Sequence, residues 1–237
     1  KIKQVANLII DIGNTALKAS WADGMTLGKT FRYQGERMMD FILSLTSKEK
    51  PEIMLLSSVR HFSEELEKEC ERLVIINESI LSYYGLPAYL TPDRAASIVA
   101  SRFLFKNRNC TIFDFGTVLT VDFLDFQGNF LGGNISPGCR TRFKALNRYS
   151  RYLPLLAAPD EIVDRGTDIA SAISSGVISG MMSEIEGYIS KYPENIAVFT
   201  GGDAIYFAKR MKNSIFVVCN LVLMGLALMA VEYDKKD

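Results

Sequence analysis

Two stretches of the sequence, far apart in the chain, have the same plan. Residues 8–15 read LIIDIGNT, and residues 111–117 read TIFDFGT. Each begins as an apolar run typical of a buried strand, continues with an aspartate, one apolar residue and a glycine, and ends in side chains that form hydrogen bonds. Such a repeat indicates an internal duplication.

The segments that follow each copy predict a similar succession of elements. After the first copy begins, we expect strands at 5–11, 16–22 and 25–33 with a turn at Asp23-Gly24, then a helix at 36–46, a strand at 53–57, a helix at 63–72 and a strand at 73–76. An irregular stretch at 83–92 leads to a helix at 93–106. From the second copy we expect strands at 111–115, 118–124 and 130–135 with a turn at 127–129, helices at 140–149 and 169–191, a strand at 196–199, a helix at 204–211, a strand at 215–218 and a helix at 221–232.

This order predicts an α/β protein of two similar domains. The chain has 237 residues, enough for two small domains in contact. We expect the first to span residues 1–90 and the second 91–237, each a mixed sheet with helices. Two such domains facing each other would leave a cleft that suits a nucleotide.

The composition argues against several classes of protein. The 27 basic residues balance 27 acidic ones, so no overall positive field favours nucleic acid as the main partner. His61 is the single histidine, and the four cysteines are scattered without a C-x-x-C pair. A zinc site, a histidine-based triad and a disulfide framework are therefore not expected. Buried free thiols in a reducing, cytoplasmic setting are the expected reading.

The longest uncharged run, residues 214–231, approaches the length of a membrane span. It contains Asn220 and Gly225, so a buried strand followed by a core helix explains it better. The chain does not open with a charged leader and an apolar core, and we expect neither a secretion signal nor a membrane segment.

The turn at residues 11–18 has the residues of a phosphate-binding loop. Gly13 lets the backbone approach an anion, Asn14 and Thr15 offer short hydrogen-bond donors, and Lys18 adds positive charge. Asp11 suits such a site if it orients a hydrated Mg²⁺ beside the phosphates. An ordinary tight turn is the alternative. The second copy, at 114–117, favours the phosphate reading, because two such loops grip one phosphate chain from both sides.

Two further glycine-bearing segments are candidates for ligand contact. Gly201 and Gly202 follow an apolar strand and precede a helix, which lets a purine or ribose lie against the backbone; a simple connector is the alternative. Residues 132–138 lead into a basic helix that either places substrate or is a solvated face. Its basic residues are Arg140, Arg142, Lys144 and Arg148.

The general base is harder to choose from residues alone. Asp93 and Arg94 open a helix directly after residues 89–92, where a substrate hydroxyl and carboxylate would meet them. An N-capping aspartate followed by a surface arginine is an equally ordinary arrangement.

In the helix at 169–191, small residues recur at every fourth position, which suits either close packing inside the monomer or a subunit interface. They are Ala172, Gly176 and Gly180.

Taken together, these segments resemble type III pantothenate kinase. The similar pieces, in the family's order, are residues 11–18, 89–94, 114–122, 132–154, 200–202 and 221–226. The resemblance implies duplicated ribonuclease H-like domains of the actin-like ATPase superfamily. It also implies a cytoplasmic homodimer that phosphorylates the primary hydroxyl of pantothenate with ATP, the first step toward coenzyme A, and that requires Mg²⁺ and either K⁺ or NH₄⁺.

The resemblance also implies a role for each site residue. Asp93 would accept the proton of the pantothenate hydroxyl, Tyr89 and Arg94 would bind the substrate, and Asp114 would ligate the monovalent cation. Asp11 would hold Mg²⁺ through water. The implied ATP-binding residues are Asp11, Ile12, Gly13, Asn14, Thr15, Ala16, Leu17, Lys18, Thr117, Gly201 and Gly202.

The chain departs from the family pattern at two places. Pro92 adjoins Asp93, where members usually have several residues ending in a glycine, so this loop is either short or incomplete in the sequence. Ile169 stands where a neighbouring subunit generally supplies a substrate-binding threonine, so that hydrogen bond is either absent or made by Thr167 or Asp168. A sugar-type kinase and a regulatory relative with weak catalysis are the alternative functions.

Overall fold

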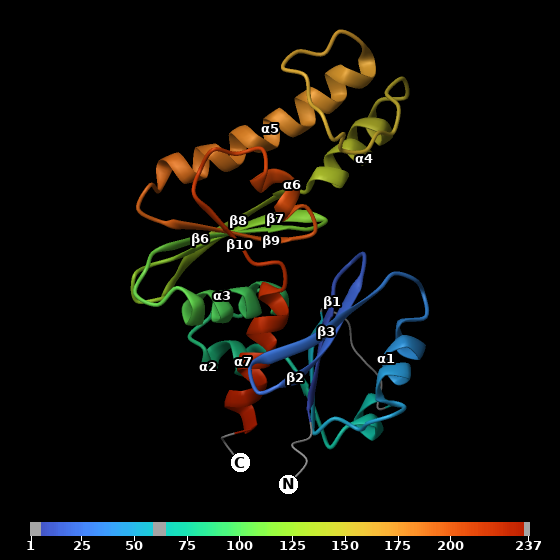
Figure 1. Ribbon diagram of the computed structural model, residues 1–237, viewed down its shortest axis with the longest axis vertical. Coiled ribbons are helices and arrows are strands. Elements are labelled where there is room, and N and C mark those ends of the chain that lie inside the picture. Colours follow the sequence, from blue (N-terminus) through green and yellow to red (C-terminus); the bar gives the residue numbers. More distant parts are fainter. Residues whose placement is uncertain (1–5, 59–64, 235–237) are drawn as a thin grey trace. The chain divides into compact units, whose positions relative to one another are not determined.

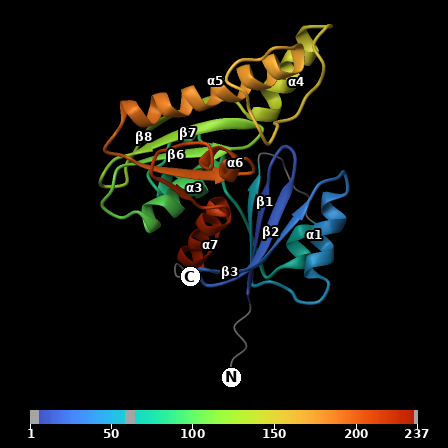
Figure 2. The same ribbon diagram turned by 45° about the horizontal axis from the view of Figure 1, so that its top comes forward.

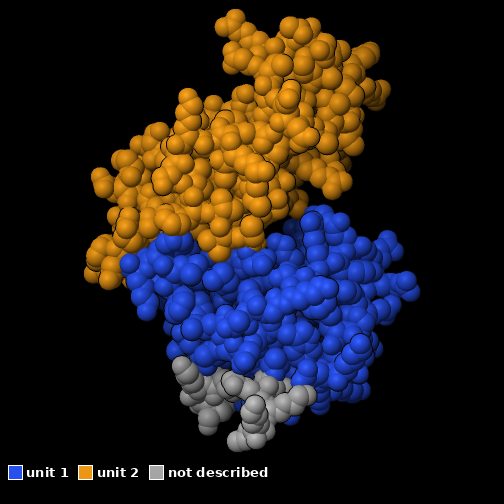
Figure 3. Space-filling model, in the orientation of Figure 1, with its two compact units in different colours: residues 1–106, 220–237 blue, residues 107–219 orange. Residues whose placement is uncertain are grey.

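The computed structural model describes residues 6–58 and 65–234. Three parts of the sequence discussed above lie outside these ranges: His61, residue 5 of the strand predicted at 5–11, and residues 63–64 of the helix predicted at 63–72. The chain forms two compact units, coloured separately in Figure 3. Unit 1 comprises Lys1–Lys106 with Asn220–Asp237, and unit 2 comprises Asn107–Cys219.

Unit 1 is built on a five-stranded sheet with the order β3-β2-β1-β4-β5 (Figure 1). Its strands are β1 (Asn7–Ile12), β2 (Leu17–Asp23), β3 (Thr26–Tyr33), β4 (Ile53–Ser58) and β5 (Arg72–Ile75). β1 pairs antiparallel with β2 and parallel with β4. Its helices are α1 (Met38–Thr46), the 3₁₀ turn η1 (Leu66–Glu69), α2 (Glu78–Tyr83), α3 (Pro92–Leu104) and α7 (Leu221–Asp234).

Unit 2 repeats this topology, as its sheet has the order β8-β7-β6-β9-β10. Figure 2 labels the strands β8, β7 and β6 of this sheet. Its strands are β6 (Cys110–Phe115), β7 (Val118–Leu124), β8 (Phe130–Pro137), β9 (Ile196–Gly201) and β10 (Ile215–Val217). Its helices are α4 (Cys139–Tyr149), α5 (Ile169–Lys191) and α6 (Ala204–Ala208). Both units therefore have an antiparallel meander followed by two parallel strands. The predicted fold class, duplicated α/β domains each with a mixed sheet, is confirmed.

Three local predictions differ from the structure. In the described part of residues 63–72 only the short turn η1 forms, and Arg72 already belongs to β5. Helix α2 was not predicted; its first turn is capped by Asn77, whose side-chain oxygen accepts from the backbone N–H of Ile80. The buried thiols are Cys70, Cys110 and Cys139, whereas Cys219 is exposed.

We expected a domain boundary between residues 90 and 91, whereas the compact units divide the chain after Lys106 and again after Cys219. Helix α3 lies in unit 1, and the chain returns to this unit at its end to add α7 (Figure 1). The reason is packing, because α7 is apolar around most of its surface and buries itself against α3 and the sheet of unit 1. A C-terminal helix that packs on the first unit cannot be assigned from its position in the sequence.

Aromatic side chains fill the core of unit 2. Phe113 and Phe115 of β6 contact Phe199 of β9, with ring centroids 5.1 and 4.8 Å apart, and Phe207 of α6 stacks on Phe115. This packing fixes the end of β6, from which the second aspartate loop, residues 114–117, begins; the first is the turn at residues 11–18. Among residues 6–58 and 65–234, no helix has both the length and the apolar character needed to cross a membrane.

Candidate active site

In unit 1, the Asp11 motif forms the tight turn between β1 and β2. The strands pair up to Ile12 and Leu17, and the backbone N–H of Gly13 donates to the carbonyl of Ala16 over 3.1 Å. This closure leaves Asn14 and Thr15 exposed at the tip. The turn therefore presents backbone and short polar side chains to solvent, as a phosphate-binding loop requires.

The carboxylate of Asp11 is held from the neighbouring strand. Asp11 and Ser57 are register partners in the parallel pair β1–β4, and the Ser57 hydroxyl donates to Asp11 Oδ1 over 2.9 Å. The pKa of Asp11 is raised to about 6, mainly by burial and then by the charge of Asp93, while the bond from Ser57 and the charge of Lys18 oppose the rise. Ser57 is buried and was missed by the sequence analysis, because an interior strand serine gives no functional signal by itself.

Asp93 lies in the first turn of α3, near enough to Asp11 for its charge to act there. Pro92 occupies the opening position of this helix, and the Asp93 carboxylate accepts from the backbone N–H of Arg94 over 2.9 Å. The Arg94 side chain is buried, while Tyr89 is 66% exposed. Unit 1 thus brings together the two carboxylates to which the resemblance assigns metal binding and proton transfer.

Replacing Asp11 by asparagine should stabilise the unliganded protein at about pH 7.5. The pKa of this carboxyl is higher in the folded chain than its ordinary value of 3.8, so its charged form opposes folding. The penalty is fully present above about pH 6 and fades as the pH falls toward 4. We expect Asp11→Asn to raise the free energy of unfolding by about 1–3 kcal/mol at pH 7.5 and by little near pH 4, measured by urea denaturation. Equal stabilisation at both pH values would contradict this.

In unit 2, Gly201 at the end of β9 and Gly202 after it lie against the second aspartate loop. Phe115 and Gly201 are register partners, and the N–H of Gly202 donates to the carbonyl of Phe115 over 2.8 Å. Gly201 has φ of +92°, and a Cβ there would lie 2.4 Å from Asp114 Oδ1. No other residue type fits so close to this carboxylate without displacing it. The structure therefore places Asp114, Gly201 and Gly202 together.

Thr117 completes this cluster from the turn between β6 and β7. Its carbonyl accepts from the backbone N–H of Gly138 over 3.1 Å and from the Thr141 hydroxyl over 2.5 Å. A Cβ at Gly138 would lie 2.2 Å from the carbonyl oxygen of Gly116. The junction of β8 and α4, which the sequence assigned either to substrate placement or to a solvated face, thus packs directly on the second aspartate loop.

Ile169 lies at the start of α5 and is 57% exposed. The carboxylate of Asp168, one of its two possible substitutes in substrate binding, caps this helix by accepting from the N–H and the hydroxyl of Ser171 over 3.0 and 2.8 Å. Of the small residues along α5, Gly176 and Gly180 are exposed, and no described atom outside the helix lies within 4 Å of a Cβ placed there. Close packing inside the monomer is therefore not found at Gly176 and Gly180.

The carboxylates of unit 1 suit a metal ion that keeps other ligands. No group of three or more His, Cys, Asp or Glu that would enclose a metal occurs among residues 6–58 and 65–234. Asp11 and Asp93 in unit 1 offer only oxygen, which Mg²⁺ prefers, and too few groups for a closed cage. Such a donor set fits an ion bound mainly through water and the phosphates of a nucleotide.

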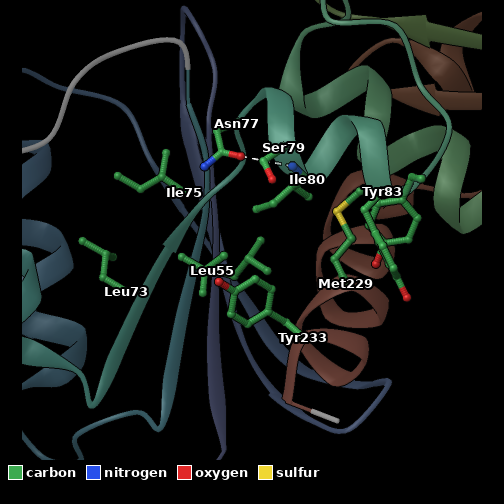
Figure 4. A pocket seen from close by; sticks show the side chains of 11 residues that line it. Leu55, Leu73, Ile75, Asn77, Ser79, Ile80, Tyr83, Met229 and Tyr233 are labelled. Atoms are coloured by element: carbon green, nitrogen blue, oxygen red, sulfur yellow. Dashed lines mark hydrogen bonds between the residues drawn. The ribbon is translucent and has the colours of Figure 1, made fainter. Parts of the chain in front are cut away.

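A separate pocket of about 360 Å³ lies within unit 1 beside the edge strand β5 (Figure 4). Leu55 of β4 lines its strand side, and Tyr83 of α2 with Met229 and Tyr233 of α7 line its helix side. None of the predicted site residues contributes to its wall. The pocket is therefore distinct from the Asp11–Asp93 cluster.

The two aspartate loops and the helix that carries Asp93 fall within a region common to one enzyme family. The sequence model of the family "Type III pantothenate kinase" matches residues 7–191. This chain belongs to that family. A type III pantothenate kinase from Azobacteroides pseudotrichonymphae is 37% identical over 97% of each chain. As a member of a kinase family, the chain uses ATP and a divalent metal ion.

Solved structures extend the likeness to the wider fold. A Campylobacter jejuni protein described as a Baf family transcriptional activator superposes with a TM-score of 0.67 at 21% identity, covering 96% of this type III pantothenate kinase family member and 99% of that chain. The activator of 2-hydroxyisocaproyl-CoA dehydratase from Clostridium difficile, with bound ADPNP, gives 0.60 at 14% identity, covering 98% and 96%. These likenesses establish the duplicated fold of the kinase.

Proposed function

We propose that this chain transfers the γ-phosphate of ATP to the primary hydroxyl of pantothenate, giving 4'-phosphopantothenate, the first step of coenzyme A biosynthesis. The observation that carries the proposal is the proximity of Asp93 and Asp11 in unit 1 of a chain that belongs to this family. Phosphoryl transfer depends on positioning and charge neutralisation. In this proposal Asp93 accepts the hydroxyl proton and Asp11 orients the metal-bound phosphates.

Residues of each aspartate loop contribute to ATP binding in this proposal. The turn at residues 11–18 holds phosphates through its backbone and Lys18, and Thr117 adds a contact. Gly201 and Gly202 contact the adenosine through their backbone in this proposal. Mg²⁺, bound to Asp11 through water, would neutralise charge on the phosphates, and Asp114 would hold K⁺ or NH₄⁺.

Pantothenate is bound in this proposal by side chains with complementary groups. The guanidinium of Arg94 suits a carboxylate, and Tyr89 is exposed where its ring and hydroxyl reach a ligand. Ile169 gives an apolar contact from the neighbouring subunit of a cytoplasmic homodimer. The exposed face of Gly176 and Gly180 supports a role for α5 in that dimer, since it lets a second backbone approach closely.

A coupled assay of ADP release with pantothenate, ATP and Mg²⁺ tests the proposal. We expect turnover with K⁺ well above that with Na⁺, because a carboxylate site for a larger cation discriminates by size and ligand number. Asp114→Asn should remove this preference. A panel of sugars should give no release above background. Tight ATP binding without release on pantothenate would instead favour a regulatory relative, for which Ile169 and the short segment before Asp93 are the supporting features.

A further inference from the structure

A closed network of hydrogen bonds joins β8, α4 and α5 of unit 2. Arg142 of α4 donates through Nη2 to Glu184 Oε2 of α5 and to Ser136 Oγ of β8, the latter over 3.2 Å. Its Nε donates to the carbonyl of Pro137 over 2.8 Å. The Ser136 hydroxyl donates to the other carboxylate oxygen, Glu184 Oε1, over 2.6 Å. Each member thus bonds to the other two elements.

The network surrounds the end of β8, immediately before Gly138. The next bonds along the chain run from Gly138 and Thr141 to the carbonyl of Thr117, and Gly138 leaves no space for a side chain beside Gly116. Val118 and Pro137 are register partners in the same pair of strands. The position of the second aspartate loop is therefore determined from one side by the segment that Arg142 and Glu184 hold.

The charges in this network are screened from solvent. The side chains of Arg142 and Glu184 are only 22% and 23% exposed. Removing one of them leaves the other charge without its partner in a poorly solvated position, which costs more than losing an exposed pair. Arg142 Nε and Nη2 and both carboxylate oxygens of Glu184 are engaged within the network, which suits a role in positioning rather than in ligand contact.

We infer that Arg142 and Glu184 are positioning residues for ATP binding, acting through residues 136–138 on the Thr117 loop. The inference rests on the proposed function, because it takes that loop as a phosphate contact. It assigns one member of the basic helix α4 to neither substrate contact nor a solvated face. A lysine at position 142 would keep the charge but lose the fork geometry that reaches Glu184, Ser136 and Pro137 together.

The test measures the Kd of ATP·Mg by titration calorimetry, beside the KM for ATP and for pantothenate. We expect Arg142→Gln and Glu184→Gln each to raise the Kd and KM for ATP by about 5- to 50-fold. The KM for pantothenate should stay within about twofold. The double variant Arg142→Gln with Glu184→Gln should be no worse than either single one, since the interaction is already lost. Arg142→Lys should rescue only part of the affinity.

Arg37→Gln is the matched control, because Arg37 and Asp40 form a pair whose side chains are 84% and 68% exposed. It should leave the Kd for ATP unchanged. Should Arg142→Gln fail to fold, Glu184→Gln decides, since its amide oxygen still accepts from Ser136. An unchanged Kd for ATP with only a lower Tm would overturn the inference, because Arg142 and Glu184 would then contribute to stability alone. Wild-type protein that binds ATP but does not phosphorylate pantothenate would contradict the proposed function. The comparison of Kd values between the variants and wild type would still test this inference.

Discussion

Asp93→Asn is expected to lower turnover on pantothenate by about 100- to 10,000-fold, the scale of a positioned general base. The asparagine keeps the shape and still accepts from the N–H of Arg94, so α3 should begin as before. Loss of the negative charge should also lower the pKa of Asp11, since Asp93 is one cause of its rise. Steady-state kinetics give the turnover, and titration calorimetry should show ATP affinity within about twofold of wild type.

Asp40→Asn is the control for this variant, because Asp40 also lies in the first turn of a helix of unit 1 but is exposed. Its turnover should match wild type. Wild-type turnover in Asp93→Asn would remove Asp93 from proton transfer. A fall confined to the KM for pantothenate would make it a binding residue instead.

Gly225→Ala is expected to destabilise unit 1 by about 2–3 kcal/mol. A Cβ at Gly225 would lie 1.9 Å from the carbonyl oxygen of Ala96, so α7 must move away from α3 to accept it. Both helices are otherwise buried here, and backbone cannot yield as a flexible side chain does. We expect Tm to fall by about 4–12 °C in thermal denaturation. Turnover should fall as well, because α3 carries Asp93.

Gly187→Ala provides the comparison, as Gly187 lies inside α5 and no described atom outside the backbone of this helix lies within 4 Å of a Cβ placed there. Alanine favours the helix at an open position, so this variant should be neutral or more stable by up to about 1 kcal/mol. Equal Tm values for Gly225→Ala and wild type would mean that α3 and α7 are not in the close contact described above.

The duplication and most elements were open to prediction, because they depend on local patterns. Both aspartate-glycine motifs end apolar strands, and α5 begins and ends at the predicted residues. Helix α2 escaped prediction because its six residues lack an apolar period long enough to stand out. The packing of α7 on unit 1 was not predicted either, since an apolar helix packs equally well on any apolar face.

The sequence alone predicts the family and its chemistry, because both follow from the residues of the two loops, including their glycines, and from the order of the motifs. The neighbours of each motif are a matter of folding, since strand register and helix packing bring together residues that no local pattern connects. Ser57 reaches Asp11 through parallel pairing, and Glu184 reaches Arg142 through the approach of α5 to α4. Burial then raises the pKa of Asp11, because removal from water depends on everything packed around a carboxylate and on nothing in its own motif.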